Sequence, residues 1–548
     1  EGFSCSVNGG GNITTGDVIL MPTVVNDSTT SYYIKRTITV NPTITDSLLP
    51  IYMDLWLDIN SLGTGLSNSL NFKYALTTSS TSPTTGVVSS GNFNGKITGD
   101  KVNLLTSKEY TATTTDTYYL WIWLDAEETS SDTMNQSFSL SLGGSCMNNV
   151  PASKPDIKDG MIPVVISSNG ITSTISEDDA SWYNYNNKEW ANMVLVSDDS
   201  SRSTYQNTSG VVVSKDDILA YYVWIPRYKY RIWTTSNSSK GSEQEIDIIF
   251  ESKDTTKSTG TQVGEYITHP AFTFGDMEVN GIWVGKFETG GTATDPLIKP
   301  DISSLRGQKV SEEFTTAQKF GTSTYGMTSN VDAHMMKNSE WGAVAYLSHS
   351  RYGVNREIYI NNSSGYYTGR SGGNVGGSTA IKTVYTNQTS KTQYNTYGFY
   401  TWDGYLLEYN TNTKSGTHDI SKVASTTGNI TGVYDMSGGA YEHVMGNYNN
   451  TIRYSSFTTL PDSKYYDNYT TINSRTACNG GICYGHGLSE VRNWHGDYAD
   501  FVGNINPWFT RGDYYNDLSS AGSFYFGARD GDAYSNQAAR SVIIYKIS

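Results

Sequence analysis

The chain has 548 residues, a formal net charge of -15 and only 38 lysines and arginines. Hydrophobic cores rarely grow beyond about 250–300 residues, so this length favours two or three domains over a single one. The acidic balance provides no basic surface for a phosphate backbone, which excludes nucleic acid as an expected partner. The sequence also lacks a run of ~20 apolar residues, so we expect no transmembrane segment.

The polarity of the chain comes mainly from uncharged residues. Charged residues make up only 17%, whereas the chain contains 41 tyrosines and is rich in Ser, Thr, Asn and Gly, a mixture typical of β-rich extracellular modules. The first residue is Glu1 rather than Met, which fits a removed secretory signal and fits a trimmed chain equally well. We therefore expect a secreted or cell-surface protein.

Residues 1–148 carry the pattern of an antiparallel β-sandwich. Between Asp17 and Cys146, apolar and polar residues alternate with a period of two, and Ser/Thr/Gly turns separate the runs. In one run Tyr52, Asp54, Trp56 and Asp58 face one way, and Ile51, Met53, Leu55 and Leu57 face the other. The segment 119–124 repeats this alternation. The sequence predicts an all-β first domain.

The four cysteines fall into two pairs. Cys5 and Cys146 bracket the first domain, and Cys478 and Cys483 lie close together in a Gly-rich turn. This placement predicts one long-range and one local disulfide, which indicates an oxidising compartment. Four free thiols remain the alternative.

The stretch 149–160 is the predicted linker, because it contains two prolines and no apolar periodicity. Beyond it, residues 161–548 mix short strands, long polar loops and two helices, which predicts an irregular α+β domain. The first helix spans Ser311–Phe320 and ends at Gly321, with two glutamates in its first turn. The second spans Asn338–Ser348 and has one apolar stripe.

Three motifs in this second domain resemble the formylglycine-generating-enzyme-like (sulfatase-modifying-factor) branch of the C-type lectin fold. They are GIWVGKFET at Gly281–Thr289, MKNSEWGAVAYLS at Met336–Ser348 and GVYDMSGGAYEHVMG at Gly432–Gly446. The third motif is the most specific. The resemblance covers some 390 residues and implies a C-type-lectin-like fold.

Within this branch, the region 492–540 is similar to the variable proteins of diversity-generating retroelements. The resemblance implies a conserved frame, formed here by Trp494, Phe501, Pro507, Trp508, Phe509, Arg511, Gly512, Ala521, Gly522, Phe524, Phe526, Gly531 and Arg540. It also implies variable ligand-binding positions between them, which here are Asn493, His495, Asn504, Asn506, Asp513, Tyr515, Asn516, Asp517, Tyr525, Arg529, Asp530, Asp532, Tyr534 and Asn536. A template repeat and a reverse-transcriptase gene beside the gene for this chain would establish that a retroelement diversifies these positions.

Composition supports the same interpretation independently. Of the 49 residues from Arg492 to Arg540, 26 are Tyr, Asn, Asp, Ser or Gly, the mixture that antibody-like binding faces use. Tyrosine gives broad, rigid contact area, and the smaller polar residues give adaptable hydrogen bonds. We expect Tyr515, Tyr525 and Tyr534 to be exposed on a face that binds a protein or glycan on another cell or on a virion.

Catalysis is the weaker interpretation. Cys478 and Cys483 have the C-x4-C spacing of formylglycine-generating enzymes, and two thiolates could bind Cu(I). However, the family places its cysteine pair after an Arg-Gly-Gly-type turn, whereas the matching turn here begins at Arg511, downstream of both cysteines. We therefore expect a binding protein without a catalytic cofactor, rather than an oxidase.

Two further possibilities stay open at this stage. The Asp/Asn-rich loops at Ser197–Ser200 and Asp513–Asp517 could bind a structural calcium ion through their side-chain oxygens. A solvated acidic loop is the simpler interpretation of each. The first domain could also assemble into a pilus, filament or surface layer, and a virion receptor-binding protein is a third, less favoured class.

Overall fold

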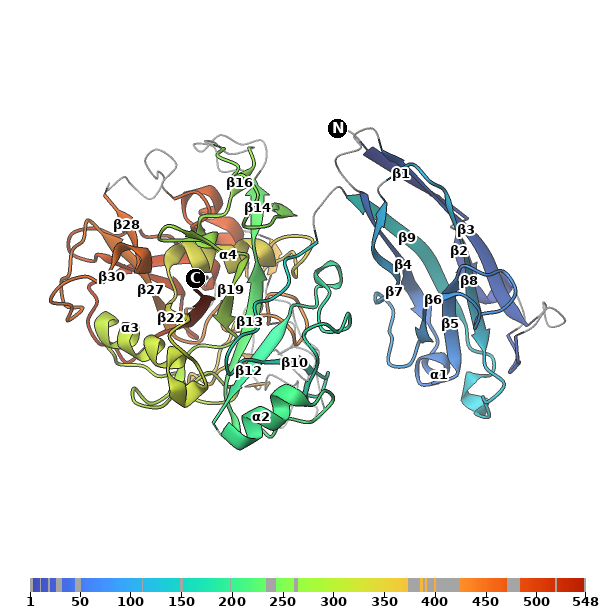
Figure 1. Ribbon diagram of the computed structural model, residues 1–548, viewed down its shortest axis with the longest axis horizontal. Coiled ribbons are helices and arrows are strands. Elements are labelled where there is room, and N and C mark those ends of the chain that lie inside the picture. Colours follow the sequence, from blue (N-terminus) through green and yellow to red (C-terminus); the bar gives the residue numbers. More distant parts are fainter. Residues whose placement is uncertain are drawn as a thin grey trace. The chain divides into compact units, whose positions relative to one another are not determined.

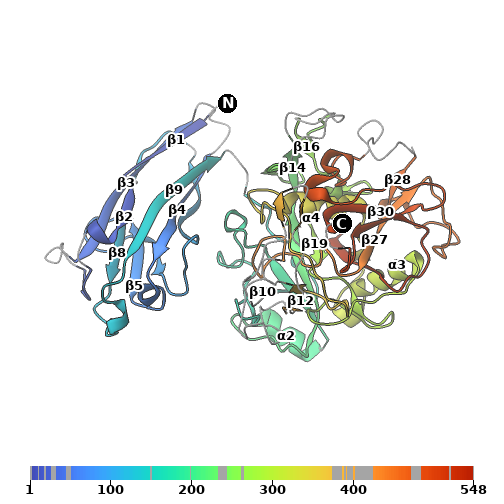
Figure 2. The same ribbon diagram turned by 180° about the vertical axis from the view of Figure 1, so that it is seen from behind.

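The computed structural model describes most of the chain in two separate units. The described residues are 3–9, 11–17, 20–25, 32–44, 51–110, 112–147, 151–197, 199–232, 243–260, 265–372, 385–387, 390–391, 399–400, 424–470, 483–517 and 520–546. Contacts divide the chain into Glu1–Pro151 and Ala152–Ser548. Both units are rich in antiparallel sheet and contain few helices (Figures 1 and 2), so the prediction of a β-rich protein is confirmed.

The first unit consists of two antiparallel sheets that share one core. The first sheet has the order β1 (Phe3–Asn8), β3 (Tyr33–Ile44), β8 (Asp116–Leu124), β5 (Phe72–Thr77) and β6 (Val87–Asn92). The second has the order β2 (Asn12–Thr14), β9 (Phe138–Met147), β4 (Ile51–Leu62) and β7 (Lys101–Tyr110). A short helix, α1 (Thr64–Ser67), follows β4.

The period-two pattern places apolar side chains of both sheets in this core. Ile51, Leu55 and Leu57 of β4 are fully buried together with Ile38 of β3 and Ile122 of β8. Burial of such side chains stabilises the unit by about 1.5–3 kcal/mol each. The predicted alternation along β4 is therefore confirmed, and the structure shows that the face with Ile51, Leu55 and Leu57 is the core face.

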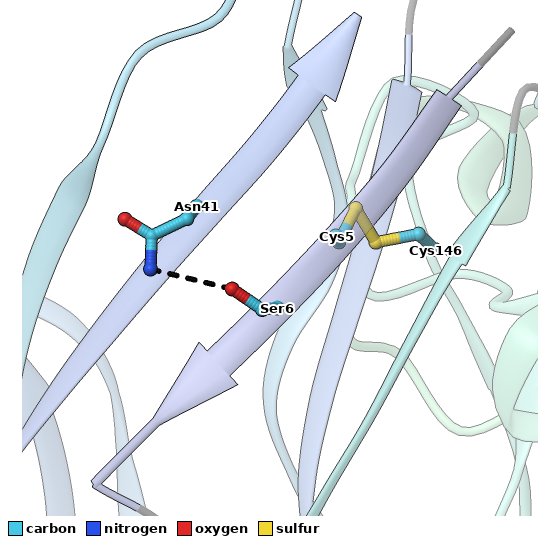
Figure 3. Close-up of a disulfide and its surroundings, with 4 residues drawn as sticks. All are labelled: Cys5, Ser6, Asn41 and Cys146. Carbon is cyan, nitrogen blue, oxygen red and sulfur yellow. Dashed lines mark hydrogen bonds between the residues drawn. A yellow bond between two sulfur atoms is a disulfide. The ribbon is translucent and has the colours of Figure 1, made fainter.

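A disulfide between Cys5 and Cys146 links β1 of one sheet to β9 of the other (Figure 3). The two Cα atoms lie 6.2 Å apart, within the range that a disulfide spans. Beside the bond, Asn41 of β3 donates a hydrogen bond to Ser6. The predicted long-range disulfide is confirmed, and it indicates an extracytoplasmic protein.

The second unit is built around a seven-stranded sheet. Its order is β11 (Thr172–Thr174), β10 (Ile162–Ile166), β12 (Asn192–Val196), β13 (Ile218–Pro226), β19 (Gly281–Gly285), β32 (Ser541–Tyr545) and β22 (Val331–Met335). A second sheet joins β28 (Asp467–Tyr469), β27 (Tyr441–Tyr448), β29 (Trp508–Gly512) and β30 (Gly522–Arg529), and β31 (Gln537–Ala539) pairs with β27. Because β32 follows directly after β31, the chain passes from this sheet into the seven-stranded one.

A three-stranded sheet has the order β15 (Asp247–Phe250), β14 (Tyr228–Arg231) and β16 (Ile267–Thr268). The remaining pairs are short: β17 (Thr273–Phe274) with β18 (Met277–Glu278), β20 (Gly290–Gly291) with β21 (Pro296–Leu297), β23 (Ser371–Gly372) with β26 (Phe399–Tyr400), and β24 (Tyr385–Asn387) with β25 (Ser390–Lys391).

Three α-helices of the second unit lie in the described residues: α2 (Asp199–Asn207), α3 (Val310–Gln318) and α4 (Asn338–Ser348). The predicted helix at Asn338–Ser348 is confirmed at both ends. The other predicted helix begins one residue earlier than expected and continues as a 3-10 turn to Gly321. All eleven residues of α4 are buried, so the expected single apolar stripe is wrong, because neighbouring segments cover the helix on every side.

Part of the expected linker 149–160 packs on the second unit. The indole of Trp224 donates a hydrogen bond to the backbone oxygen of Ser153, and the indole of Trp283 donates to that of Asp156. Both tryptophans belong to the seven-stranded sheet. Residues 152–160 are therefore part of the second unit rather than a free linker.

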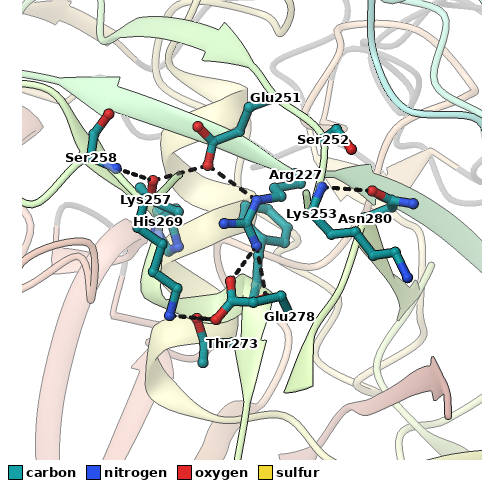
Figure 4. A network of polar contacts seen from close by, with 12 residues as sticks. Arg227, Glu251, Ser252, Lys253, Lys257, Ser258, His269, Thr273, Glu278 and Asn280 are labelled. Carbon is teal, nitrogen blue, oxygen red and sulfur yellow. Dashed lines mark hydrogen bonds and ion pairs between the residues drawn. The ribbon is translucent and has the colours of Figure 1, made fainter. Parts of the chain in front are cut away.

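A buried ion network fixes the three-stranded sheet (Figure 4). Arg227, which precedes β14, is fully buried and pairs with Glu251 at 3.1 Å and with Glu278 at 2.6 Å. Thr268 of β16 donates to Glu251, and Lys257 pairs with Glu278. The Arg227 guanidinium therefore holds the segments of Glu251 and Glu278 at the start of β14.

Candidate functional site

A rigid hairpin formed by β29 and β30 carries the candidate site. Trp508, Phe509, Phe524 and Phe526 are at most 1% exposed, so the residues expected to form a frame do pack inside. Trp494 is also buried, whereas Phe501 is only partly buried.

One buried arginine ties this hairpin to the rest of the unit, and a second fixes the neighbouring strand β27. Arg511 of β29 donates to the side chain of Asn338 on α4 and to the backbone oxygens of His486 and Gly487. Burial lowers the pKa of Arg511 to about 9. Arg540 forms a bidentate pair with Glu442 of β27. Such charge-assisted contacts hold the hairpin backbone in a single position.

The turn after β29 is shaped by two residues in the left-handed region. Gly512 has φ +77° and Asp513 has φ +62°, which sends the chain sharply away from the strand. Glycine adopts this conformation freely and Asp is one of the few other residues that tolerate it. The turn therefore presents residues 514–517 beside β27, where Tyr515 N donates to the backbone oxygen of Gly439.

Five aromatic side chains meet at this turn, and we call them the tyrosine cluster: Tyr366, Tyr441, Tyr514, Tyr515 and Tyr525. Ring centroids are 5.1 Å apart for Tyr441 and Tyr514, 5.3 Å for Tyr514 and Tyr515, and 5.0 Å for Tyr366 and Tyr515. Tyr441 also lies 6.0 Å from Tyr525. These distances suit mutual ring contact, which makes the cluster a rigid surface.

Two carboxyl groups lie against the cluster. The hydroxyl of Tyr441 donates to Asp517 at 2.6 Å. Asp513 is 1% exposed, and burial together with the neighbouring Asp517 raises its pKa to about 8. Both effects favour the protonated form of the Asp513 carboxyl.

Two arginines stack on the same aromatic rings. The guanidinium of Arg306 lies 4.0 Å from the ring centroid of Tyr366, and that of Arg529 lies 4.7 Å from that of Tyr441. Arg306 also donates to the backbone oxygen of Ser535, which brings the segment 530–536 next to the cluster. The surface thus combines aromatic, acidic and basic groups within one region.

The fourteen predicted ligand positions differ in exposure. Those that are exposed are Asn493, Asn504, Asn506, Asn516 and Tyr534, and those that are partly buried are Tyr515, Asp517, Arg529, Asp530, Asp532 and Asn536. His495, Asp513 and Tyr525 are buried. The expectation that Tyr515, Tyr525 and Tyr534 are all exposed is wrong for Tyr525, which is 3% exposed because its ring packs against Tyr441 and Tyr498.

The predicted positions also fall into separate groups. Asp513, Tyr515, Asp517, Tyr525 and Arg529 belong to the tyrosine cluster or contact it. Asn504 and Asn506 lie in the turn before Trp508, at the opposite end of β29 from Asp513.

His495 lies at a different place from the cluster. Its Nε2 is 2.9 Å from Nε2 of His349, and its Nδ1 is 3.4 Å from Glu243 and 3.6 Å from Glu357. Asn493 and His495 both have positive φ values, 62° and 56°, so this segment is held in a strained conformation by its contacts. His495 thus anchors a loop and does not face solvent.

Four contributors to the cluster were not among the predicted ligand positions: Tyr366, Tyr441, Tyr514 and Arg306. Tyr441 lies inside the motif Gly432–Gly446, which indicated the fold and no ligand position, and Tyr514 lies between the predicted positions Asp513 and Tyr515. Tyr366 and Arg306 lie 126 and 186 residues before Arg492, where the variable region begins. Only the alternation of residues in β27 could have indicated that Tyr441 faces the same side of the sheet as the hairpin residues.

The described part of the chain includes some of the residues considered for a metal site or for a cysteine pair. No group of three or more His, Cys, Asp or Glu side chains suited to a metal ion occurs there. Of the loop considered for calcium, Asp199 and Ser200 start α2 instead, and Asp199 pairs with Arg202. Cys483 is buried, but Cys478 lies outside the described residues, so the local disulfide stays a prediction.

The search for a helix that could cross a membrane finds none among the described residues. No protein-family model matches the chain, and comparison with curated proteins gives no match.

Proposed function

We propose that the protein is a secreted or cell-surface ligand-binding protein rather than an enzyme. Its second unit is a C-type-lectin-like scaffold of the formylglycine-generating-enzyme-like branch, similar to retroelement-diversified variable proteins. The tyrosine cluster and the neighbouring segment 530–536 form the ligand face. The ligand is a protein or glycan on another cell or on a virion.

The observation that carries this proposal is a difference in burial: the hairpin β29-β30 has buried framework side chains, whereas other side chains of the same region are exposed. Trp508, Phe509 and Arg511 are fully buried, whereas Asn516 and Tyr534 are exposed. Substitutions of exposed residues usually change stability by less than about 0.5 kcal/mol. A scaffold of this kind tolerates varied side chains on its face without unfolding.

The chemistry of the face supports recognition of a polar partner. Rigid tyrosines give contact area at a small cost in conformational entropy, and their hydroxyls add hydrogen bonds. The Cys5–Cys146 disulfide supports an extracytoplasmic location for the whole chain.

A pair of display libraries tests the proposal. One library randomises six positions of the face: Tyr515, Asn516, Asp517, Asp532, Tyr534 and Asn536. The matched control randomises six exposed positions of α2: Asp199, Ser200, Ser203, Thr204, Gln206 and Asn207. Both are selected for binding to hen lysozyme as a model protein target.

We expect most members of both libraries to keep a thermal transition close to that of the parent chain. Only the face library should yield binders, with Kd values in the micromolar range or better, because only that face offers rigid aromatic neighbours. Extensive unfolding in the face library, or equally frequent binders in the α2 library, would contradict the proposal. Sequencing several copies of the gene would test diversification, since substitutions should concentrate at the predicted positions.

A second candidate function is an assembling subunit of a pilus, filament or surface layer. The first unit favours it through β6, an edge strand on which Val87 and Val88 are 46% and 40% exposed. Exposed edge strands can pair with another chain. Electron microscopy of the purified protein would distinguish the two functions, because ordered fibres are not expected of a solitary ligand-binding protein.

A further inference from the structure

The outer face of the sheet β2-β9-β4-β7 carries a tryptophan, Trp56, whose indole lies against the backbone of the neighbouring strand β9. Trp56 points outward, because its neighbours Leu55 and Leu57 on β4 are fully buried in the core. Its register partners are Gly143 on β9 and Asn103 on β7. The indole thus lies in the middle of the sheet rather than at an edge.

Gly143 allows the indole to approach β9 closely. A Cβ atom at position 143 would lie 2.4 Å from both Nε1 and Cε2 of the Trp56 indole, a distance that real side chains do not adopt. The backbone of Gly143 does not have a positive φ, so its conformation does not require glycine. The close approach of the indole is the reason that a side chain does not fit there.

Hydrogen-bonding groups surround the indole. Its Nε1 donates to Asp58 at 3.0 Å, which fixes the orientation of the ring. Lys101 lies 3.7 Å from Asp58 and 4.3 Å from the ring centroid, and its side chain is 56% exposed. Across the strands, Asp58 faces Ser141 and Asp54 faces Ser145. Lys101 offsets the charge of Asp58, and Asp54 leaves a further carboxylate on this face, which disfavours an anionic ligand.

The other tryptophans of the first unit are placed differently. Trp121 and Trp123 of β8 are 1% and 8% exposed and pack with Tyr33 and Ala75 on the outer side of the other sheet. Among the described residues, Trp56 belongs to neither hydrophobic cluster of the unit. It is a partly exposed aromatic side chain on a flat polar surface.

We infer that this face is a saccharide-binding site that takes a neutral pyranose chain. A pyranose ring has an apolar face of C–H groups, which suits an aromatic ring, and a rim of hydroxyls, which suits carboxylates, amides and serines. A few placed polar groups around an apolar contact are the usual composition of small-ligand sites. Lys101 can be displaced by the sugar, because an exposed ion pair stabilises by at most about 1 kcal/mol.

The test uses isothermal titration calorimetry of the full chain with cellohexaose, chitohexaose and mannohexaose. We expect at least one of these hexaoses to bind with a Kd below about 1 mM. Trp56→Ala should weaken that binding at least tenfold, and Trp56→Phe should retain part of it. Asn103→Ala should weaken it several-fold without changing the packing of the sheet, so the test stands even if Trp56→Ala fails to fold.

Tyr119→Ala is the matched control, since Tyr119 is a partly buried aromatic residue beside Lys35 on the outer side of the other sheet. It should bind the hexaose as the parent chain does. A chain with both Tyr515→Ala and Tyr534→Ala should also bind normally, which separates this site from the proposed ligand face of the second unit. Absence of binding to all three hexaoses, or unchanged binding after Trp56→Ala and Asn103→Ala, would overturn the inference.

Discussion

Glu490 has a buried carboxyl group and lies just before the variable region, which begins at Arg492. It accepts hydrogen bonds from the hydroxyls of Tyr230 and Tyr346 and from the backbone N–H of Gly485. Burial raises the pKa of Glu490 to about 7, although these three donors act in the opposite direction. The folded protein therefore binds a proton at this residue more tightly than the unfolded chain does.

This shift makes stability depend on pH. Because the folded pKa is raised from 4.5 to about 7, the contribution of Glu490 is fully present below pH 4.5 and is lost as the pH rises to about 7. Glu490→Gln should remove this dependence and, at pH 8, raise the free energy of unfolding of the second unit by on the order of 2–3 kcal/mol. Urea denaturation at pH 5 and pH 8 measures it.

Glu177→Gln serves as the control, because the Glu177 side chain is 42% exposed. It should keep the pH dependence of the parent chain. If Glu490→Gln showed that same dependence, the assignment of the raised pKa to Glu490 would be wrong.

At the scale of elements, the three-stranded sheet depends on Arg227. Its guanidinium and the Glu251 carboxylate are at most 3% exposed, so removal of the arginine leaves a carboxylate buried without its partner. We expect Arg227→Met to lower the free energy of unfolding by about 3–5 kcal/mol. Chemical denaturation followed by circular dichroism gives this value.

Arg231→Met on β14 is the matched control for Arg227. Arg231 pairs with Asp247, and both side chains are 40% exposed, so water screens the pair. Its loss should cost no more than about 1 kcal/mol. Equal costs for the two variants would show that burial does not set the strength of the network.

At the scale of the whole molecule, the Cys5–Cys146 disulfide closes a loop of 141 residues within the first unit. In the chain-entropy model, a loop of this size stabilises by about 5 kcal/mol. The double variant Cys5→Ser, Cys146→Ser should therefore lower the stability of the first unit by about this amount. Hydrogen exchange followed by mass spectrometry reports the two units separately.

The second unit should keep its exchange protection in that variant, because Glu1–Pro151 and Ala152–Ser548 are separate compact units. Loss of protection in both units would show that they unfold together. Unchanged protection in the first unit would mean that its shared core suffices without the covalent bond.

The sequence determined the features that depend on local patterns. The alternation at residues 51–58 identified two opposite faces of β4, and the apolar pattern at Asn338–Ser348 indicated both ends of α4. These features depend on neighbours within a few residues, so a single segment contains the information. The spacing of Cys5 and Cys146 likewise indicated their pairing.

Tertiary structure alone decided which side chains are covered. Tyr525 and Asp513 have the residue types of a binding face, yet both are buried, because Tyr441 and Tyr498 pack over Tyr525 and the turn folds Asp513 inward. Tyr366 and Arg306 contact the cluster although they are distant from it in the sequence. Burial depends on which distant segment packs over a residue. The periodicity of a single segment does not contain that information.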